Sequence, residues 1–202
     1  MINETDQPPR SSSFWDRFWD NSNLDNARRA TLTISARLAA ELLDGEPVSR
    51  VLDLGCGFGE VAIMVSRRLH ASIVAADISE HAVSATSSAT RTAGLMDRIC
   101  TVRADCYRLG FADCAFDAVM SYGYASAASY EGAEKEVARV LRPGGVAVID
   151  FRNISFYNTV LDPMAGWRIW RRYRRHEKVY HLGPLGLREH FAPAGLDLEQ
   201  IV

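Results

Sequence analysis

The chain has 202 residues and a formal net charge of only −2 at neutral pH. This length suits one domain with a substantial core, and the 48% of apolar residues is ordinary for a globular protein. The near-neutral balance excludes a strongly basic composition, so it gives no reason to expect a nucleic-acid partner.

The first segment, residues 1–13, is polar and contains Pro8 and Pro9. We expect it to be a disordered tail. It has no apolar stretch of the kind that a signal peptide or a membrane anchor requires, so the expected location is cytoplasmic.

A helical lid or cap is expected over residues 14–45. Its first part is a short helix that Ser13 is expected to cap, with four aromatic side chains on one face: Phe14, Trp15, Phe18 and Trp19. These side chains are equally compatible with two roles: a lid over a flat substrate, or packing of the helix against the core. A longer helix is expected over residues 25–44, with Ile34, Leu38 and Leu42 facing inward and Gly45 ending it.

Strands and helices alternate from Arg50 onward. Strands are expected near residues 50–54, 72–77, 99–104, 116–121 and 145–151, and helices near residues 59–69, 79–93 and 131–141. This alternation predicts an α/β fold with a doubly wound, mainly parallel sheet and helices on both faces.

The tail, residues 152–202, is less regular. We expect a short helix over residues 184–194 and a strand over residues 196–201. A segment over residues 167–178 lies between the core and this expected helix, and aromatic residues recur in it at every third position among cationic residues. This segment is typical of a solvated helix that covers the sheet. It is also compatible with peripheral contact with a membrane or a lipid-like substrate, or with binding of an acidic substrate. Binding of nucleic acid ranks last, because no RNA-binding motif accompanies the segment.

The most informative segment is VLDLGCGFGE, residues 51–60. A short apolar run containing Asp53 leads into three alternating glycines, which allow positive φ and close backbone approach to a ligand. A dinucleotide site has the spacing G-x-G-x-x-G, whereas here Glu60 takes the place of the third glycine. A carboxylate there repels a pyrophosphate, so the pattern favours a nucleoside that carries an amino-acid tail.

This segment resembles motif I of the class I S-adenosylmethionine-dependent methyltransferases, in particular the small-molecule branch similar to quinone-biosynthesis C-methyltransferases. Three later segments fit in order: residues 73–78 (IVAADI), 102–106 (VRADC), and the pair 116–121 (FDAVMS) and 141–145 (LRPGG). The resemblance covers residues 48–151 and implies a Rossmann-like core. The family's sheet normally ends in two further strands, whereas the tail has residues for one. An abbreviated C-terminal sheet edge is therefore expected, with a truncated chain or completion of the sheet by a partner as the alternatives.

The resemblance implies roles for individual residues in binding S-adenosylmethionine. Asp53 would hold the amino group of its methionine, Asp77 both ribose hydroxyls, and Asp105 the adenine amino group. The full set of expected cofactor-binding residues is Asp53, Gly55, Cys56, Gly57, Asp77, Ile78, Asp105, Cys106 and Ser121. Ser121 and Tyr122 would border the place where the methyl group emerges.

The catalytic group is unknown, because the family has no universal catalytic residue and a base is needed only when the acceptor loses a proton. The side chains considered are Tyr122, Tyr124, Tyr157, His181 and His190, with Tyr122 and His181 as the candidates retained. Trp15, Trp19, Tyr122 and Tyr157 are the expected substrate-binding residues. No metal is expected, because the four cysteines show no paired spacing.

The expected function is transfer of a methyl group from S-adenosylmethionine to a small, apolar or aromatic metabolite. Two alternatives are retained: a relative that binds the cofactor without methyl transfer, as a cyclase or regulator, and a dinucleotide-dependent oxidoreductase. The acceptor atom and the oligomeric state are left open by the sequence.

Overall fold

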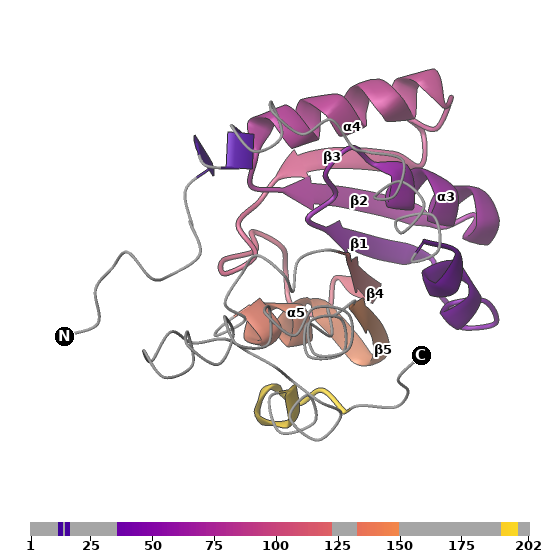
Figure 1. Ribbon diagram of the computed structural model, residues 1–202. Helices are drawn as coiled ribbons and strands as arrows, with labels where there is room; N and C mark the ends of the chain where they lie inside the picture. Colours follow the sequence, from indigo (N-terminus) through magenta and orange to yellow (C-terminus); the bar gives the residue numbers. More distant parts are fainter. Residues whose placement is uncertain (1–11, 14, 17–35, 123–132, 150–190, 198–202) are drawn as a thin grey trace, which may run out of the picture.

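The computed structural model describes residues 12–13, 15–16, 36–122, 133–149 and 191–197. These residues contain a five-stranded parallel sheet with the strand order β3-β2-β1-β4-β5 (Figure 1). The strands are β1 (Arg50–Leu54), β2 (Ser72–Asp77), β3 (Ile99–Arg103), β4 (Phe116–Ser121) and β5 (Leu141–Ile149), and the named helices are α3 (Glu60–Leu69), α4 (Glu80–Thr92), α5 (Ala133–Val140) and the 3₁₀ turn η3 (Ala192–Ala194). The predicted doubly wound α/β fold is therefore confirmed.

The strand order reverses at β1, which lies in the centre of the sheet. Asp53 of β1 is in register with Ala75 of β2 on one side and with Met120 of β4 on the other. In open sheets of this kind, ligands bind outside the carboxyl ends of the strands at such a reversal. The topology therefore directs attention to the segment that follows β1.

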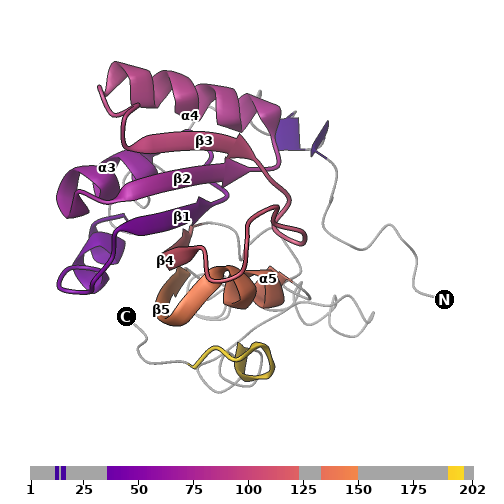
Figure 2. The same cartoon turned by 180° about the vertical axis from the view of Figure 1, so that it is seen from behind.

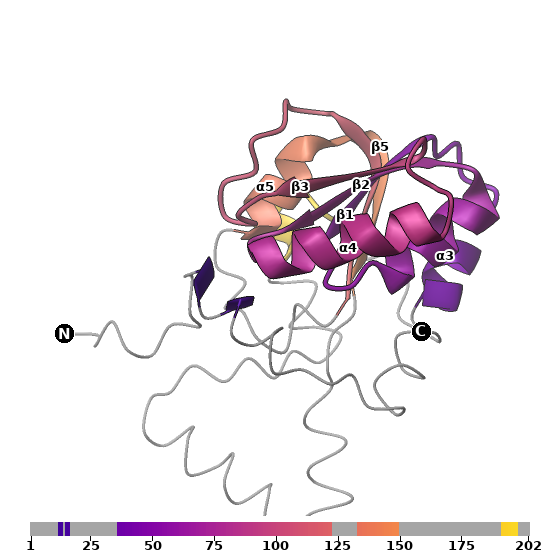
Figure 3. The ribbon, with the colours of Figure 1, turned by 90° about the horizontal axis from the view of Figure 1, so that it is seen from above.

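Helices cover both faces of the sheet (Figures 2 and 3). Successive strand residues point to opposite faces, so Val51 and Leu52 belong to two different apolar clusters. One cluster joins the sheet to α3 and to a helix over residues 36–42, on the face that α4 also covers. The other cluster joins it to α5. Burial on both faces explains why the strands read as nearly continuous apolar runs.

The helix over residues 36–42 packs on a different face from the one predicted. Its buried residues are Ala36, Ala39 and Ala40, followed by Leu43, whereas Leu38 and Leu42 are only partly buried. Small alanine side chains let the helix approach its neighbours closely, which large leucines on the same face would prevent. Gly45 follows with φ 93°, as expected for a glycine after a helix end. Residues 25–35, including Ile34, lie outside the described part of the chain.

Strand β5 begins at Leu141, four residues earlier than predicted. Leu141 pairs with Phe116, and the register then shifts before Ala118 pairs with Val146. The intervening turn needs glycine, because a Cβ on Gly145 would lie 2.9 Å from two carbonyl oxygens.

The described parts of the two ends of the chain differ in detail from expectation. Ser12 and Ser13 are both helical, so Ser13 lies within the helix that it was expected to cap. Near the other end, η3 is followed by Gly195 with φ 82°, whereas Leu196 and Asp197 are not in a strand. The rest of the predicted strand, residues 198–201, lies outside the described residues, as does most of the predicted helix over residues 184–194.

Arg139 of α5 fixes the connection between β3 and β4. Its guanidinium donates hydrogen bonds to the carbonyl oxygens of Leu109 and Phe111 and forms ion pairs with Glu136 and Asp113. The connection that follows β3 is therefore attached to α5. Among the described helices, none has the length and apolar content needed to cross a bilayer.

Candidate functional site

Three aspartates from different strands meet at one edge of the sheet. Asp53 is the penultimate residue of β1, Asp77 ends β2, and Asp105 follows the end of β3. The parallel ladder continues past β3, where the N–H of Ala104 donates to the carbonyl oxygen of Asp77. The three carboxylates predicted from the sequence to bind one ligand are thus brought to the same edge.

The glycine loop after β1 is fastened to the end of β2. The N–H groups of Gly55 and Cys56 both donate to the carbonyl oxygen of Ala76, at 2.8 and 3.0 Å. The N–H of Gly57 donates to Oδ2 of Asp77 at 3.1 Å. Gly55 has φ 80°, and a Cβ built on it meets no atom within 4 Å. The loop therefore presents an open side at Gly55, where backbone is accessible to a ligand.

Thr86 of α4 holds the opposite side of the loop. Its hydroxyl donates to the carbonyl oxygen of Gly57 at 2.8 Å and lies 3.5 Å from the thiol of Cys56. A Cβ on Gly59 would lie 2.8 Å from Cγ2 of Thr86, so the third glycine is required for close packing of loop and helix. Burial raises the pKa of the Cys56 thiol, so this sulfur stays protonated and serves packing.

Asp53 is the most unusual group at this edge. Its side chain is 2% exposed, and Oδ2 has no hydrogen-bond partner. Burial, followed by repulsion from Asp77, raises the pKa of Asp53 to about 7. The charge of Glu60 acts in the same direction, whereas a hydrogen bond from the N–H of Ala62 in α3 acts in the opposite direction. A buried carboxylate oxygen without a partner is unfavourable, so this atom is suited to receive a positively charged hydrogen-bond donor.

Asp77 is also buried, but both of its oxygens have partners. Oδ2 accepts from the N–H of Gly57 and Oδ1 accepts from the N–H of Ser79 at 3.0 Å. Burial raises the pKa of Asp77, while these backbone donors act in the opposite direction. Each carboxylate oxygen has two lone pairs, so Asp77 retains capacity to accept hydrogen bonds from a pair of ligand hydroxyls.

Ser79 caps α4 and connects the sheet edge to the N-terminal segment. Its Oγ accepts from the N–H of Ala82 at 3.2 Å and donates to Oδ1 of Asp16 at 2.6 Å. The residue that caps α4 is therefore Ser79 and not Asp77.

The segment that follows β3 lies beside the end of β2. Oδ1 of Asp105 accepts from the N–H of Tyr107 at 3.0 Å, which folds the chain into a turn around Asp105 and Cys106. Next to it, the carbonyl oxygen of Ile78 accepts from Nε of Arg103 at 3.1 Å. Ile78, Asp105 and Cys106 are all partly exposed, so a ligand can reach them.

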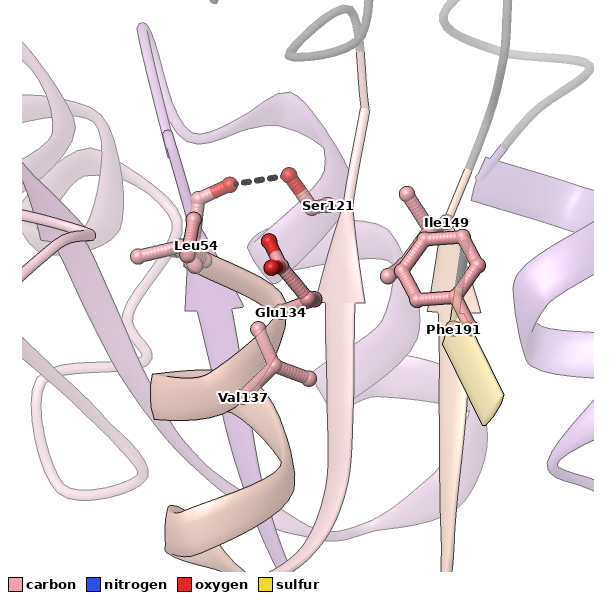
Figure 4. A pocket seen from close by; sticks show the side chains of 7 residues that line it. Leu54, Ser121, Glu134, Val137, Ile149 and Phe191 are labelled. Carbon is pink, nitrogen blue, oxygen red and sulfur yellow. Dashed lines mark hydrogen bonds between the residues drawn. The ribbon is translucent and has the colours of Figure 1, made fainter. Parts of the chain in front are cut away.

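Ser121 has a structural contact at the end of β4. Its hydroxyl donates to the carbonyl oxygen of Leu54 at 2.8 Å (Figure 4). It lines a small cavity, toward which Glu134 extends from α5; the lining residues are Leu54, Ser121, Ala133, Glu134, Val137, Ile149 and Phe191. Glu134 is only 8% exposed although its side chain is acidic, because it lies on the buried face of α5, and no sequence pattern singles it out.

The predicted acceptor side is described only in part. Tyr122 follows β4 and is partly exposed, and Trp15 is partly buried in the N-terminal helix. Trp19, Tyr124, Tyr157, His181, His190 and the basic segment over residues 167–178 lie outside the described residues. Across residues 36–122, 133–149 and the shorter described pieces, no group of His, Cys, Asp and Glu is arranged to hold a metal ion.

Comparison with known proteins identifies the core. Residues 51–145 match the family described as methyltransferase domain. This segment is therefore a methyltransferase domain, in agreement with the resemblance of its motifs to the class I enzymes. The matched residues include the glycine loop and the ends of the first four strands, which are the parts that build the edge described above.

Two of the similar proteins are named methyltransferases, and a solved structure that is also similar is named a cyclase. Methyltransferase GfsG of Streptomyces halstedii is 32% identical over 136 residues, which are 66% of this chain and 49% of that protein. Demethylmenaquinone methyltransferase of Thermus thermophilus is 36% identical over 115 residues, 56% of this chain and 51% of that protein. The crystal structure of the [4+2]-cyclase SpnF superposes with a TM-score of 0.56 at 30% identity, covering 65% of this chain and 48% of that one. The chain spans about half the length of these relatives.

Sequence reasoning missed Thr86, Ser79 and Asp16. A serine two residues after a strand and directly before an acidic residue is a helix-capping signal, so Ser79 was within reach. Thr86 lies in the middle of a run of small residues in α4, and Asp16 meets Ser79 across 63 positions of sequence. Local pattern carries no signal for either contact.

The first prediction concerns the close packing at Gly59. Gly59→Ala combines a φ of +81° with a Cβ placed 2.8 Å from Thr86, so we expect it to lower the free energy of unfolding by about 2–4 kcal/mol. Gly94→Ala is the matched control, because Gly94 has φ +68° but no atom within 4 Å of its Cβ position. Denaturant unfolding measures both; equal losses for the two variants would contradict the packing role of Thr86.

The second prediction concerns the repulsion at Asp53. Since the pKa of Asp53 is raised to about 7 from its ordinary value of 3.8, ionising this group in the folded state is unfavourable. This penalty is complete above pH 7 and disappears as pH falls toward 4. We expect Asp53→Asn to stabilise the ligand-free protein by on the order of 1–3 kcal/mol at pH 8 and by less at pH 5. Asp97→Asn, at an exposed position, is the control. A loss of stability in Asp53→Asn at pH 8, measured by denaturant unfolding, would show that the carboxylate stabilises the empty site.

Proposed function

We propose that this protein transfers a methyl group from S-adenosylmethionine to a small, apolar or aromatic metabolite. The observation that carries the proposal is the buried, unpartnered Oδ2 of Asp53 beside Asp77. Two buried carboxylates disfavour an anionic ligand and favour one with an ammonium group and a nucleoside. The family of the core supports the same cofactor.

The residues present fit this cofactor. The ammonium group of its amino-acid tail would pair with Asp53 near the open side of Gly55, and the ribose hydroxyls would donate to Asp77. Ile78 and the turn at Asp105 and Cys106 would flank the adenine. These assignments follow the order of strand ends across the sheet, from β1 through β2 to β3.

When bound, the cofactor supplies a sulfonium methyl group that is already activated for displacement. The contribution of the protein is then mainly to hold the acceptor in line at about 3 Å from that methyl group and to exclude water. The end of β4, where Tyr122 follows Ser121, lies next to β1 and so borders the acceptor side. Tyr122 and His181 remain the candidates for a base, and Trp15, Trp19, Tyr122 and Tyr157 for acceptor contacts.

A dinucleotide-dependent oxidoreductase is disfavoured by the same groups. A pyrophosphate at this loop would approach Asp53 and Glu60, and its repulsion would add to that already present between Asp53 and Asp77. Thermal shift with S-adenosylhomocysteine and with NADH separates the two functions, because we expect only the former to stabilise the protein.

A second function is suggested by the likeness to SpnF, a protein named a [4+2]-cyclase. In this second function, the protein would bind the cofactor without transferring its methyl group. Incubation of the protein with methyl-labelled S-adenosylmethionine and a metabolite extract distinguishes the cases. Methyl transfer predicts label in an extracted product, whereas cofactor binding with no labelled product supports the second function.

The third prediction tests the ribose contact. Asp77→Ala is expected to weaken binding of S-adenosylhomocysteine by on the order of 1–3 kcal/mol, because hydrogen bonds to a charged acceptor are lost. Isothermal titration calorimetry measures the affinity. Asp97→Ala is the matched control, since Asp97 is exposed and away from the loop. Unchanged affinity in Asp77→Ala would refute the ribose role.

A further inference from the structure

Among the described residues of the N-terminal segment, Asp16 contacts the beginning of α4. Oδ1 of Asp16 accepts a 2.6 Å hydrogen bond from the hydroxyl of Ser79 and lies 3.4 Å from the N–H of His81. The described pieces of this segment, residues 12–13 and 15–16, lie beside that end of α4 in all three views (Figures 1–3). This end of α4 adjoins the carboxyl end of β2.

Ser79 links Asp16 to the group proposed to hold the ribose. The N–H of Ser79 donates to Oδ1 of Asp77, and its Oγ accepts from Ala82 while donating to Asp16. The N–H and the hydroxyl of Ser79 therefore form one chain of hydrogen bonds from Asp77 to Asp16. A displacement of Asp16 would free the Ser79 hydroxyl next to the turn that carries Ile78.

The electrostatic surroundings keep Asp16 ionised. The Ser79 hydrogen bond, above all, lowers the pKa of Asp16, and the backbone N–H groups of His81 and Glu80 and the charge of Arg103 act in the same direction. These donors belong to the first turn of α4, where the helix dipole favours a negative charge. The contact is therefore charge-assisted at neutral pH.

We propose that Asp16 is a positioning residue that seats the N-terminal segment against the ribose and adenine side of the cofactor site. The proposal rests on the proposed cofactor. It places this segment at the end of β2, so that Asp16 contributes to cofactor affinity through Ser79 and the turn at Ile78. The direct contacts with the cofactor are left to Asp77 and its neighbours.

Coupling of this kind acts in both directions. If seating of the segment raises cofactor affinity, then bound cofactor must favour the seated segment by the same factor. The sequence provides a readout, because trypsin cleaves after arginine, and Arg10 and Arg17 flank the described residues 12–13 and 15–16. Bound cofactor should slow cleavage at these two positions.

The test compares S-adenosylhomocysteine binding to the wild type, Asp16→Ala, Asp16→Asn and the control Asp97→Ala by calorimetry. We expect Asp16→Ala to weaken binding about threefold to tenfold, the range for loss of one hydrogen bond. Asp16→Asn is expected to lose less, because an amide oxygen still accepts from Ser79. Asp97→Ala is expected to bind as the wild type does.

A double-mutant cycle separates positioning from general destabilisation. Ser79→Ala also removes the cap on Ala82, so its own loss is not diagnostic. If Asp16 acts through Ser79, then Asp16→Ala has little further effect on affinity in the Ser79→Ala background. In the wild-type background, S-adenosylhomocysteine should slow tryptic cleavage after Arg10 and Arg17, and this protection should be reduced in Asp16→Ala.

The outcomes are distinct. A wild type that binds S-adenosylhomocysteine and an Asp16→Ala variant with the same affinity and the same protection would overturn the role of Asp16 and leave the proposed function in place. Equal losses from Asp16→Ala in both backgrounds would show that it acts by a route other than Ser79. A wild type that does not bind S-adenosylhomocysteine would overturn the proposed function together with this inference.

Discussion

Two carboxylates, Asp53 and Asp77, are buried close together at the centre of the parallel sheet. The strand ladder fixes their positions, because Asp53 is in register with Ala75 two residues before Asp77. Neither can move toward solvent without disrupting the sheet. Burial, followed by repulsion from Asp77, raises the pKa of Asp53 to about 7, and one oxygen of Asp53 has no hydrogen-bond partner. An ionised Asp53 is therefore unfavourable in the folded protein, and the proposed cationic ligand would relieve this cost.

The glycine loop depends on the same pair. Asp77 accepts the N–H of Gly57 on one side and that of Ser79 on the other, so one carboxylate holds both the loop after β1 and the start of α4. Thr86 of α4 also holds the loop, because its hydroxyl donates a hydrogen bond to the carbonyl oxygen of Gly57. Loop, helix and strand end are thus joined before any ligand binds, as a preorganised site requires.

Much of the core could be predicted from the sequence. Four of the five strands begin at the residue predicted, because buried strands of a parallel sheet read as short apolar runs that end in charged or turn-forming residues. The meeting of Asp53, Asp77 and Asp105 followed from topology, since parallel strands bring their carboxyl ends to one edge.

What could not be predicted arises from packing and from distant contacts. The helix over residues 36–42 buries alanines in preference to Leu38 and Leu42, because the space available favours small side chains. Strand β5 begins four residues before the predicted start, because Leu141 already pairs with Phe116. The register then shifts across the turn that contains Gly144 and Gly145. The raised pKa of Asp53 and the contact between Asp16 and Ser79 depend on residues brought together only by the fold.

Calorimetric titration with S-adenosylhomocysteine at pH 7, in buffers of different ionisation enthalpy, tests the central claim most directly. If Asp53 receives the ligand's ammonium group, its pKa falls on binding and about half a proton is released per site. The same experiment with 5′-methylthioadenosine, which lacks the amino-acid tail, should release none. Binding of S-adenosylhomocysteine without proton release, or equal release with both ligands, would contradict the account.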